Sequence, residues 1–267
     1  MIHPTAIVDS AATLDASVEV GPYSVIEAGV SIGPGNIIGP HVVISRGTAI
    51  GARNRFHAGC VIGDAPQDLK YRDEATRVVI GDDNVFREHF TVHRSTSLVQ
   101  NTAIGSHNFF MANSHVGHNC VVGNHVIVAN GALLAGHVTI QDRVFISGNC
   151  LVHQFTRVGT LAMMQGGSGV SKDLPPFTIA RRQNEICGLN IVGLRRAGFT
   201  PQQRIELKRL YHALFRSGKN LREAVAAARD FTAGPARTML DFLGESQRGF
   251  CAERSGKLRG DNEEVRD

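Results

Sequence analysis

The sequence predicts a mainly β protein in which a parallel β-helix is followed by a small α-helical domain. Three observations predict this fold. Large apolar residues recur every six positions over the first 170 residues, small residues alternate with them, and the pattern stops before a segment with helix-start signals. A period of six does not fit the 3.6-residue turn of a helix. Repeating units that cannot bury their apolar side alone stack into solenoids.

The repeat is nearly continuous. Of the 29 positions reached by steps of six from Ile2 to Val170, 27 are large and apolar, and only Asp68 and Glu74 interrupt the series. Three six-residue sides make a triangular coil, and successive coils stack with a rise of about 4.8 Å. Three of the five cysteines take the small inward position, and no CxxC occurs. We therefore predict core positions rather than disulfides or a structural zinc site for Cys60, Cys120 and Cys150.

Two segments depart from the pattern. Residues 63–79, GDAPQDLKYRDEATRVV, keep the phase of the repeat but are charged and contain a proline, so we expect them to project as a loop. A weaker departure lies around residues 95–102. Loops that project from a rigid scaffold often carry function.

The repeat ends after the DLPP sequence at 173–176. We divide the chain into a β-helix over 1–190, an α-helical C-terminal domain over 191–250 and a disordered tail over 251–267. Thr200-Pro201-Gln202-Gln203 is typical of a capping box with proline at the first helical position. The predicted helices run from there to about Ser217, from Asn220 to Asp230, and from Pro235 to about Phe242.

Composition limits the function classes. Hydrophobic residues make up 42% and charged residues 19% of the 267 residues, which excludes wholesale disorder. No run of 18 apolar residues is present and the N-terminus lacks a secretory signal pattern, so we expect no membrane span and a cytoplasmic location. Residues 191–250 carry 11 basic and five acidic side chains, which favours an acidic partner. Few aromatics accompany them, which argues against nucleic acid.

Histidines gather on one corner of the predicted prism. An 18-residue coil brings His118, His137 and His153 within one residue of a common column, with His115 three residues earlier and His93 about one coil below. The sheet geometry predicts a spacing of about 5 Å between coils.

Three interpretations of this cluster compete. The histidines can be structural decoration of a solenoid. They can bind zinc, as in a γ-type carbonic anhydrase, although the spacing between His115 and His118 does not match that family. They can also supply a general base, because an imidazole with a pKa near 6.5 is mostly neutral in the cytoplasm and accepts a proton from a hydroxyl.

Several motifs decide between these interpretations. The sequences NSHVGHNC, LLAGHV and LVHQF at 113–120, 133–138 and 151–155 closely resemble the UDP-N-acetylglucosamine O-acyltransferases of lipid A synthesis. The resemblance covers nearly the whole chain. It includes QDLKY at 67–71, HRST at 93–96, GGSGV at 166–170, DLPPF at 173–177 and LNIVGLRRAGF at 189–199.

The resemblance implies a left-handed β-helix, a homotrimer with active sites between subunits, and no cofactor or metal. The implied reaction moves an R-3-hydroxyacyl group from acyl carrier protein to the 3-hydroxyl of UDP-N-acetylglucosamine. His118 matches the general base, and Gly136 matches the backbone N–H that stabilises the oxyanion. The implied substrate-binding residues are Asp68, Lys70, His93, His115, His137, His153, Gln154, Gly166 in the floor of the acyl groove, and Asn190 and Arg196 from a neighbouring subunit. The candidates for docking the acidic carrier are Arg195, Arg204, Lys208, Arg209 and Arg216.

The chain also departs from the family. Asn119 follows the base where well-known members carry Asp, and RRQ at 181–183 replaces a different stretch near the acyl tunnel. Some relatives accept a 3-amino sugar, and no residue of this sequence decides between that acceptor and a 3-hydroxyl. Another hexapeptide acyltransferase remains an alternative, either the N-acyltransferase of the same pathway, which usually carries an additional N-terminal uridine-binding domain, or an acetyl-CoA-dependent enzyme. A zinc-dependent γ-type carbonic anhydrase is the alternative from a different class.

Overall fold

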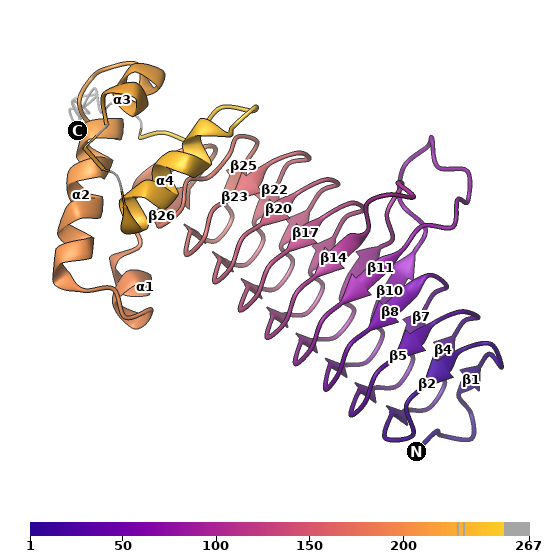
Figure 1. Cartoon of the computed structure of the whole chain (residues 1–267). Helices are drawn as coiled ribbons and strands as arrows, with labels where there is room; N and C mark the ends of the chain where they lie inside the picture. The colour runs from indigo at the N-terminus through magenta and orange to yellow at the C-terminus, as the bar shows by residue number, and fades with distance from the viewer. Residues whose placement is uncertain (229, 232, 254–267) are drawn as a thin grey trace, which may run out of the picture.

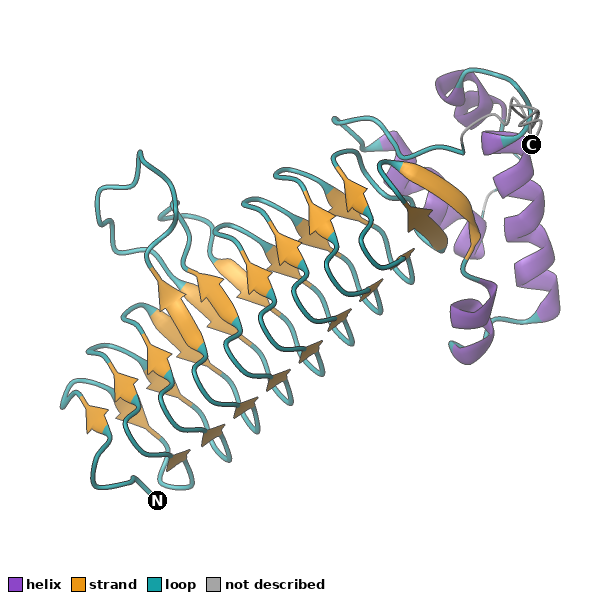
Figure 2. Cartoon of the chain, turned by 180° about the vertical axis from the view of Figure 1, so that it is seen from behind, coloured by secondary structure: helices purple, strands orange, loops and turns teal. Residues whose placement is uncertain are grey.

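A computed structural model describes residues 1–228, 230–231 and 233–253. The chain forms a long parallel β-helix with a cluster of helices at its C-terminal end (Figure 1). Seen from behind, the short strands line up as three faces of a prism, and one loop projects far from it (Figure 2). The predicted parallel β-helix is therefore confirmed.

Each face of the prism is one sheet, and all but the last coil contribute a strand to each of the three. The first sheet contains β1 (Ile7–Val8), β4 (Val25–Ile26), β7 (Val43–Ile44), β10 (Val61–Asp64), β13 (Thr91–His93), β16 (His115–Val116), β19 (Leu133–Leu134), β22 (Leu151–Val152) and β25 (Gly169–Val170). The second contains β2 (Thr13–Leu14), β5 (Ser31–Ile32), β8 (Thr48–Ile50), β11 (Val78–Ile80), β14 (Thr102–Ile104), β17 (Val121–Val122), β20 (Thr139–Ile140) and β23 (Arg157–Val158). The third contains β3 (Glu19–Val20), β6 (Ile37–Ile38), β9 (Arg55–Phe56), β12 (Val85–Phe86), β15 (Phe109–Phe110), β18 (Ile127–Val128), β21 (Phe145–Ile146), β24 (Met163–Met164), β26 (Thr178–Arg181) and the antiparallel β27 (Glu185–Leu189).

The large repeat residues fill the prism. From Val20 onward nearly all of them are buried, and Phe56, Phe86 and Phe110 stack with ring centroids 4.7 and 5.2 Å apart. Cys60, Cys120 and Cys150 are also buried, as predicted, and none forms a disulfide. Burial raises the pKa of the Cys60 and Cys120 thiols to about 12, so both stay protonated core residues. These cysteines therefore contribute to packing in the prism interior and have no role as nucleophiles.

From Val20 onward, one apolar position in the series is not in the core. Leu98 keeps the phase of the repeat but is 70% exposed. It lies in the connection between β13 and β14, where Thr91 pairs with His115 and a coil therefore contains 24 residues instead of 18. The extra residues of this coil leave the wall, so Leu98 has no inward position to occupy. The apolar phase alone could not reveal this.

Both insertions emerge from the same corner of the prism, between the first and second sheets. Residues 65–77 connect β10 to β11 and form the large projecting loop (Figure 2). Residues 94–101 connect β13 to β14 one coil later. Two consecutive coils therefore carry long loops at this corner, and the coils that follow carry short turns there.

The described residues after the β-helix form four helices: α1 (Ile191–Arg196), α2 (Pro201–Phe215), α3 (Leu221–Ala227) and α4 (Gly234–Gly244). The predicted capping box at Thr200 is confirmed, because Thr200 Oγ1 accepts from the Gln203 N–H and Gln203 Oε1 accepts from the Thr200 N–H. The second predicted helix is shorter than expected: α3 ends at Ala227 rather than Asp230.

The helices pack on the end of the prism through a second apolar cluster that includes Leu161 and Phe177 of the β-helix. Arg157 joins the two parts. Its guanidinium donates to Asp173 Oδ2 at 3.0 Å and to the Phe242 carbonyl at 2.6 Å, and it lies 4.3 Å from the centroid of the Phe242 ring.

The expected tail has to be corrected for its first three residues. Cys251 is fully buried, Ala252 pairs with Glu185, and Glu253 accepts hydrogen bonds from Tyr211 and Arg216 at 2.7 Å. This short segment joins β27 to α2. The rest of the predicted tail, 254–267, lies outside the described residues. Among the described helices none is both long and apolar enough to cross a membrane.

Candidate active site

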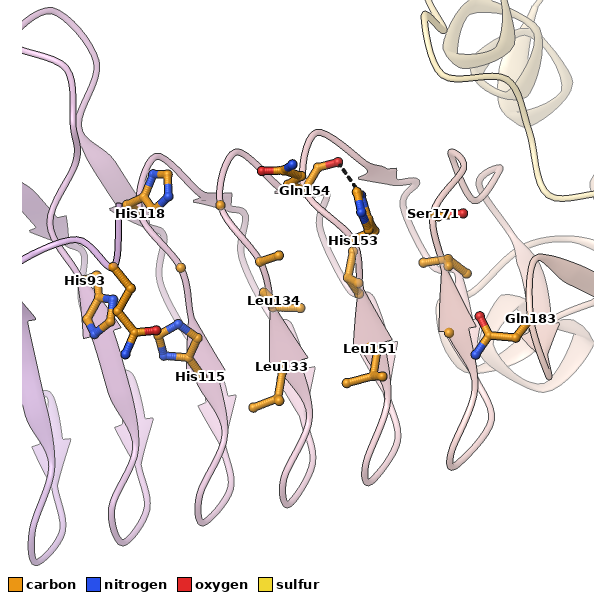
Figure 3. Close-up of a pocket in the computed structure, with 17 residues that line it drawn as sticks. His93, His115, His118, Leu133, Leu134, Leu151, His153, Gln154, Ser171 and Gln183 are labelled. Carbon is orange, nitrogen blue, oxygen red and sulfur yellow. Dashed lines mark hydrogen bonds between the residues drawn. The ribbon is translucent and has the colours of Figure 1, made fainter. Parts of the chain in front are cut away.

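The predicted histidines lie on successive connections between the first and second sheets. His118 follows β16, Gly136 and His137 follow β19, and His153 and Gln154 follow β22. The rings of His118 and His137 lie 5.2 Å apart and nearly perpendicular. His93 and His115 form a second pair on the first sheet, 4.8 Å apart (Figure 3). The corner predicted from the coil length is therefore present.

His93 and His115 form a neutral pair beside His118. His115 Nδ1 lies 2.7 Å from Thr91 Oγ1. Burial, assisted by the neighbouring imidazoles, lowers the pKa of His115 to about 4. Burial also lowers the pKa of His93. Both rings are therefore uncharged near neutral pH and offer hydrogen bonds without adding positive charge.

His118 has a single hydrogen-bond partner on one side of its ring. Its Nδ1 lies 2.7 Å from Oδ1 of Asn119, which is buried. Because an amide oxygen only accepts, Nδ1 carries the hydrogen and Nε2 keeps its lone pair. Among the described residues Nε2 has no hydrogen-bond partner. The free nitrogen belongs to a residue that lines the main pocket, where it can accept a proton.

Gly136 lies directly against this ring. A Cβ added at Gly136 would be 2.6 Å from Nε2 and Cε1 of His118, so only glycine allows the imidazole this close to the chain. No hydrogen bond among the described residues uses the Gly136 N–H. A free N–H next to a proton-accepting nitrogen is the arrangement that acyl transfer through a tetrahedral oxyanion requires.

His137, His153 and Gln154 continue the corner. The His137 ring stacks on Phe155 at 4.5 Å, and burial lowers the pKa of His137, with the His118 charge acting in the same direction and Asp68 opposing it. His153 and Gln154 are exposed at the rim. His137 is not among the residues that line the main pocket, whereas His153 and Gln154 are.

A buried arginine anchors the projecting loop over the corner. Arg94 is 5% exposed; its guanidinium donates to the Gly63 carbonyl at 3.0 Å, to the Tyr71 hydroxyl at 2.9 Å and to Asp73 Oδ1 at 3.3 Å. Asp73 also pairs with Arg46. These contacts hold the segment that contains Asp68, which is half-buried, and Lys70, which is exposed.

The main pocket has a volume of about 570 Å³ and lies along the first sheet (Figure 3). His115, Leu133, Leu151 and Gly169 occupy matching positions on four consecutive strands, so the wall changes from imidazole to leucine to glycine. Leu133 and Leu151 are 43% and 50% exposed although they are large and apolar. An apolar strip that starts beside the proton-accepting histidine suits an acyl chain.

Three predicted residues lie away from this pocket within one chain. Gly166 is on the corner between the third and first sheets, with no heavy atom closer than 3.6 Å to an added Cβ. Asn190 caps α1 through the Gly193 N–H and donates to the Leu161 carbonyl, so its amide is already engaged. Arg196 is exposed on α1.

The structure also shows pocket residues that the sequence named only within longer motifs or not at all. The pocket is lined by Gln67 from the projecting loop, Leu133 and Leu151 from the strands, and Ser171 near its far end. Gln183 covers Gly169, since an added Cβ there would be 2.6 Å from its amide. The repeat predicts which strand positions point outward. The neighbouring residues in the sequence do not indicate whether an outward position lines a groove or open surface.

Among the described residues no group of three His, Cys, Asp or Glu side chains is arranged to hold a metal ion.

Family models match both parts of the chain. A model of bacterial hexapeptide-repeat transferases matches residues 11–46 and 101–136. A model described as the second domain of UDP-N-acetylglucosamine O-acyltransferase matches residues 173–251, which include the helices.

Solved structures of similar fold include UDP-N-acetylglucosamine acyltransferases from Francisella novicida and Bacteroides fragilis. The first has 35% identity, a TM-score of 0.92 and covers 99% of this chain and 100% of its own. The second has 38% identity, a TM-score of 0.90 and covers 94% and 99%.

Curated relatives are named acyl-[acyl-carrier-protein]--UDP-N-acetylglucosamine O-acyltransferase. One from Paraburkholderia phymatum is 47% identical over 93% of this chain and 98% of its own length. Another, from Anaeromyxobacter dehalogenans, is 48% identical over the same shares. These comparisons confirm the resemblance seen in the motifs, and the chain belongs to the UDP-N-acetylglucosamine O-acyltransferase family.

Proposed function

We propose that this protein transfers an R-3-hydroxyacyl group from acyl carrier protein to the 3-hydroxyl of UDP-N-acetylglucosamine, the first step of lipid A synthesis. The observation that carries the proposal is that, among the described residues, neither Nε2 of His118 nor the nearby N–H of Gly136 has a hydrogen-bond partner. The names of the relatives supply the donor and the acceptor. The leucine strip of the pocket supports an acyl substrate.

In the proposed reaction His118 acts as general base. Nε2 takes the proton of the sugar 3-hydroxyl while the oxygen of that hydroxyl attacks the carbonyl carbon of the thioester. The Gly136 N–H donates to the oxyanion that forms. When the intermediate collapses, the C–S bond breaks and the His118 imidazolium returns its proton to the thiolate of the carrier. Atoms and charges balance without a cofactor.

Asp68, Lys70 and Gln67 hold the sugar nucleotide in this proposal, because Arg94 anchors their loop over the same corner. His93 and His115 contribute neutral hydrogen-bonding groups, His153 and Gln154 line the rim of the pocket, and His137 lies against the His118 ring. The acyl chain follows Leu133 and Leu151.

We propose that the active enzyme is a homotrimer with sites between subunits. Asn190, Arg196 and Gly166 lie away from the pocket of their own chain, so a role at the site requires a neighbour. Mixing His118→Ala and Arg196→Ala subunits should restore activity in verified mixed trimers. No recovery in such trimers would contradict shared sites.

The acyl carrier protein is proposed to dock on the basic helices. Of the five candidates, Arg216 pairs with Glu253 and Arg204 donates to the Phe199 carbonyl, whereas Arg195, Lys208 and Arg209 are exposed. These last three are the expected contacts. Salt should therefore raise the KM for the carrier, and charge reversal at Lys208 should raise it more than reversal at Arg143, which is on the β-helix.

The function is tested by incubating the protein with R-3-hydroxyacyl carrier protein and either UDP-N-acetylglucosamine or its 3-amino analogue. Mass spectrometry should detect the acylated UDP-sugar, and mild alkali should release the acyl group because the product is an ester. If the only product comes from the 3-amino analogue and is stable to alkali, the enzyme forms an amide, and O-acylation is contradicted. Acylation from acetyl-CoA but not from the carrier would contradict both.

A further inference from the structure

Asn119, the neighbour of the proposed base, has partners for every polar atom of its side chain. It is 2% exposed. Oδ1 accepts from the Thr96 N–H at 3.1 Å and from the Thr96 hydroxyl at 2.9 Å. Nδ2 donates to Ser95 Oγ at 2.6 Å. Two residues of the 94–101 connection therefore hold this amide at both ends.

These contacts fix which way the amide points. A backbone N–H can only donate, so the atom that faces the Thr96 N–H has to be the oxygen. The same oxygen lies 2.7 Å from His118 Nδ1, which must then carry a hydrogen. The tautomer of His118 with a free Nε2 is thus set by a chain of donors and acceptors that begins in the neighbouring coil.

Ser95 completes this chain because an amide, unlike a carboxylate, has N–H groups that need an acceptor. Ser95 is fully buried, and its Oγ also accepts from the Ser97 N–H at 2.9 Å. Without this hydroxyl the Nδ2 group would be buried and lack its acceptor, a state that proteins strongly disfavour. Rotating the amide would not help, since its NH₂ would then face the Thr96 N–H.

We propose that Ser95 is a positioning residue: through Asn119 it holds His118 in the tautomer whose Nε2 is free to accept a proton. Ser95 touches neither substrate nor the reacting atoms. The inference rests on the proposed function only in assigning proton transfer to His118, whereas the tautomer itself is a property of the resting protein.

A double-mutant cycle tests the proposal. In the native background Ser95→Ala should lower kcat about tenfold or more with little change in KM, because a buried donor loses its acceptor. In the Asn119→Asp background the same substitution should cost less than about threefold, since a carboxylate has no N–H to satisfy. Asp is suited to this position because the backbone φ of residue 119 is 60°, a region that Asn and Asp both tolerate.

The matched control is Ser97→Ala, a serine two residues along the same loop whose Oγ accepts, among the described residues, from the Val99 N–H alone. It should leave kcat unchanged. Equal losses from Ser95→Ala in both backgrounds would overturn the proposal, and so would a Ser95→Ala protein as active as the control. Circular dichroism and size-exclusion profiles of each variant establish that the fold is kept.

The ¹⁵N chemical shifts of the His118 ring provide a second readout that does not depend on turnover. In the native protein they should show a protonated Nδ1 and a bare Nε2, and Ser95→Ala should mix the two tautomers. A native ring protonated at Nε2 would overturn the proposal. If His118→Ala retains full activity while the native ring shows the expected tautomer, the general-base assignment fails and the positioning by Ser95 stands.

Discussion

Two corners of the same prism carry histidines on successive coils, and among the described residues one of these corners combines the parts proposed for an active site. At the corner between the second and third sheets, His107 and His125 stack 4.8 Å apart and nearly parallel, and His107 Nδ1 is 3.9 Å from Asp83. At the corner between the first and second sheets, His118 and His137 are 5.2 Å apart. The repeat alone therefore produces imidazole columns at either corner.

The difference lies in what surrounds each column. His118 has a buried amide partner, a glycine against its ring and a 570 Å³ pocket. It also sits on the next coil after two inserted loops. His107 and His125 lie on plain turns and are exposed. Loops and close backbone contacts that interrupt the repeat therefore distinguish the proposed active-site corner from an exposed column of histidines.

The largest effect is expected from removing the proposed base. His118→Ala should reduce turnover by about 10²–10⁴-fold, the usual cost of losing a general base. His125→Ala at the other corner should leave turnover unchanged, because its ring lies on the surface. Steady-state assays of both variants make the comparison. Equal losses of turnover in His118→Ala and His125→Ala would mean that both histidines support the fold and that His118 is not the general base.

The next effect concerns the close contact at Gly136. Gly136→Ala should lower kcat by about 10²-fold or more, because the added methyl overlaps the His118 ring and displaces either the base or the oxyanion donor. Gly148→Ala is the control, since its added Cβ meets only the Asn130 carbonyl at 3.4 Å. A fully active Gly136→Ala enzyme would rule out the N–H of this residue as the donor.

A smaller effect is expected from acid. The pKa of His115 is lowered to about 4 in the folded protein, so between pH 6.5 and 4 the unfolded chain binds a proton there that the folded chain does not. Stability is then lost as pH falls, by at most about 3 kcal/mol. His115→Gln should flatten the fall of the thermal midpoint between pH 8 and 5, and His107→Gln should not. Parallel curves for native and His115→Gln proteins would contradict the assignment.

The smallest effect concerns acyl length. We propose that Gly166 lies in the floor of an acyl groove completed by a neighbouring subunit and that glycine leaves this groove open, so we predict a preference for hydroxyacyl chains of the C12–C14 class over C10. Gly166→Met should shift preference to shorter chains by about fourfold per methylene displaced, the equivalent of about 0.8 kcal/mol of burial. Competition between carriers of graded chain length measures the shift. An unchanged profile would place the length limit elsewhere, for example at Gln183.

Much of the prism was predictable because large apolar residues recur every six positions in the sequence. The position of Cys60 in the core and of His118 and His137 in one column both follow from counting by six and eighteen. Leu98 shows the limit of that counting, since it keeps phase but lies in an inserted loop. Handedness was expected only from the family, because the period is the same for either hand.

The parts of the site that escaped prediction depend on contacts between distant residues. The anchoring of the projecting loop by Arg94 and the cover of Gly169 by Gln183 have no periodic signal. Ser95 and Asn119 are 24 residues apart, and their hydrogen bond exists only because an inserted loop folds back on the next coil. Likewise, the attachment of Glu253 to Tyr211 joins a charged end segment to a helix 42 residues earlier.

The most direct test of the central claim is hydrogen–deuterium exchange with and without UDP-N-acetylglucosamine. The ligand should protect backbone amides at 65–77, 94–101 and 117–120, the inserted loops and the His118 turn. Amides at 105–108 and 123–126, which carry the other histidine column, should exchange at the same rate in both states. Protection of the second set, or of neither set, would contradict a site built by the loops at the first corner.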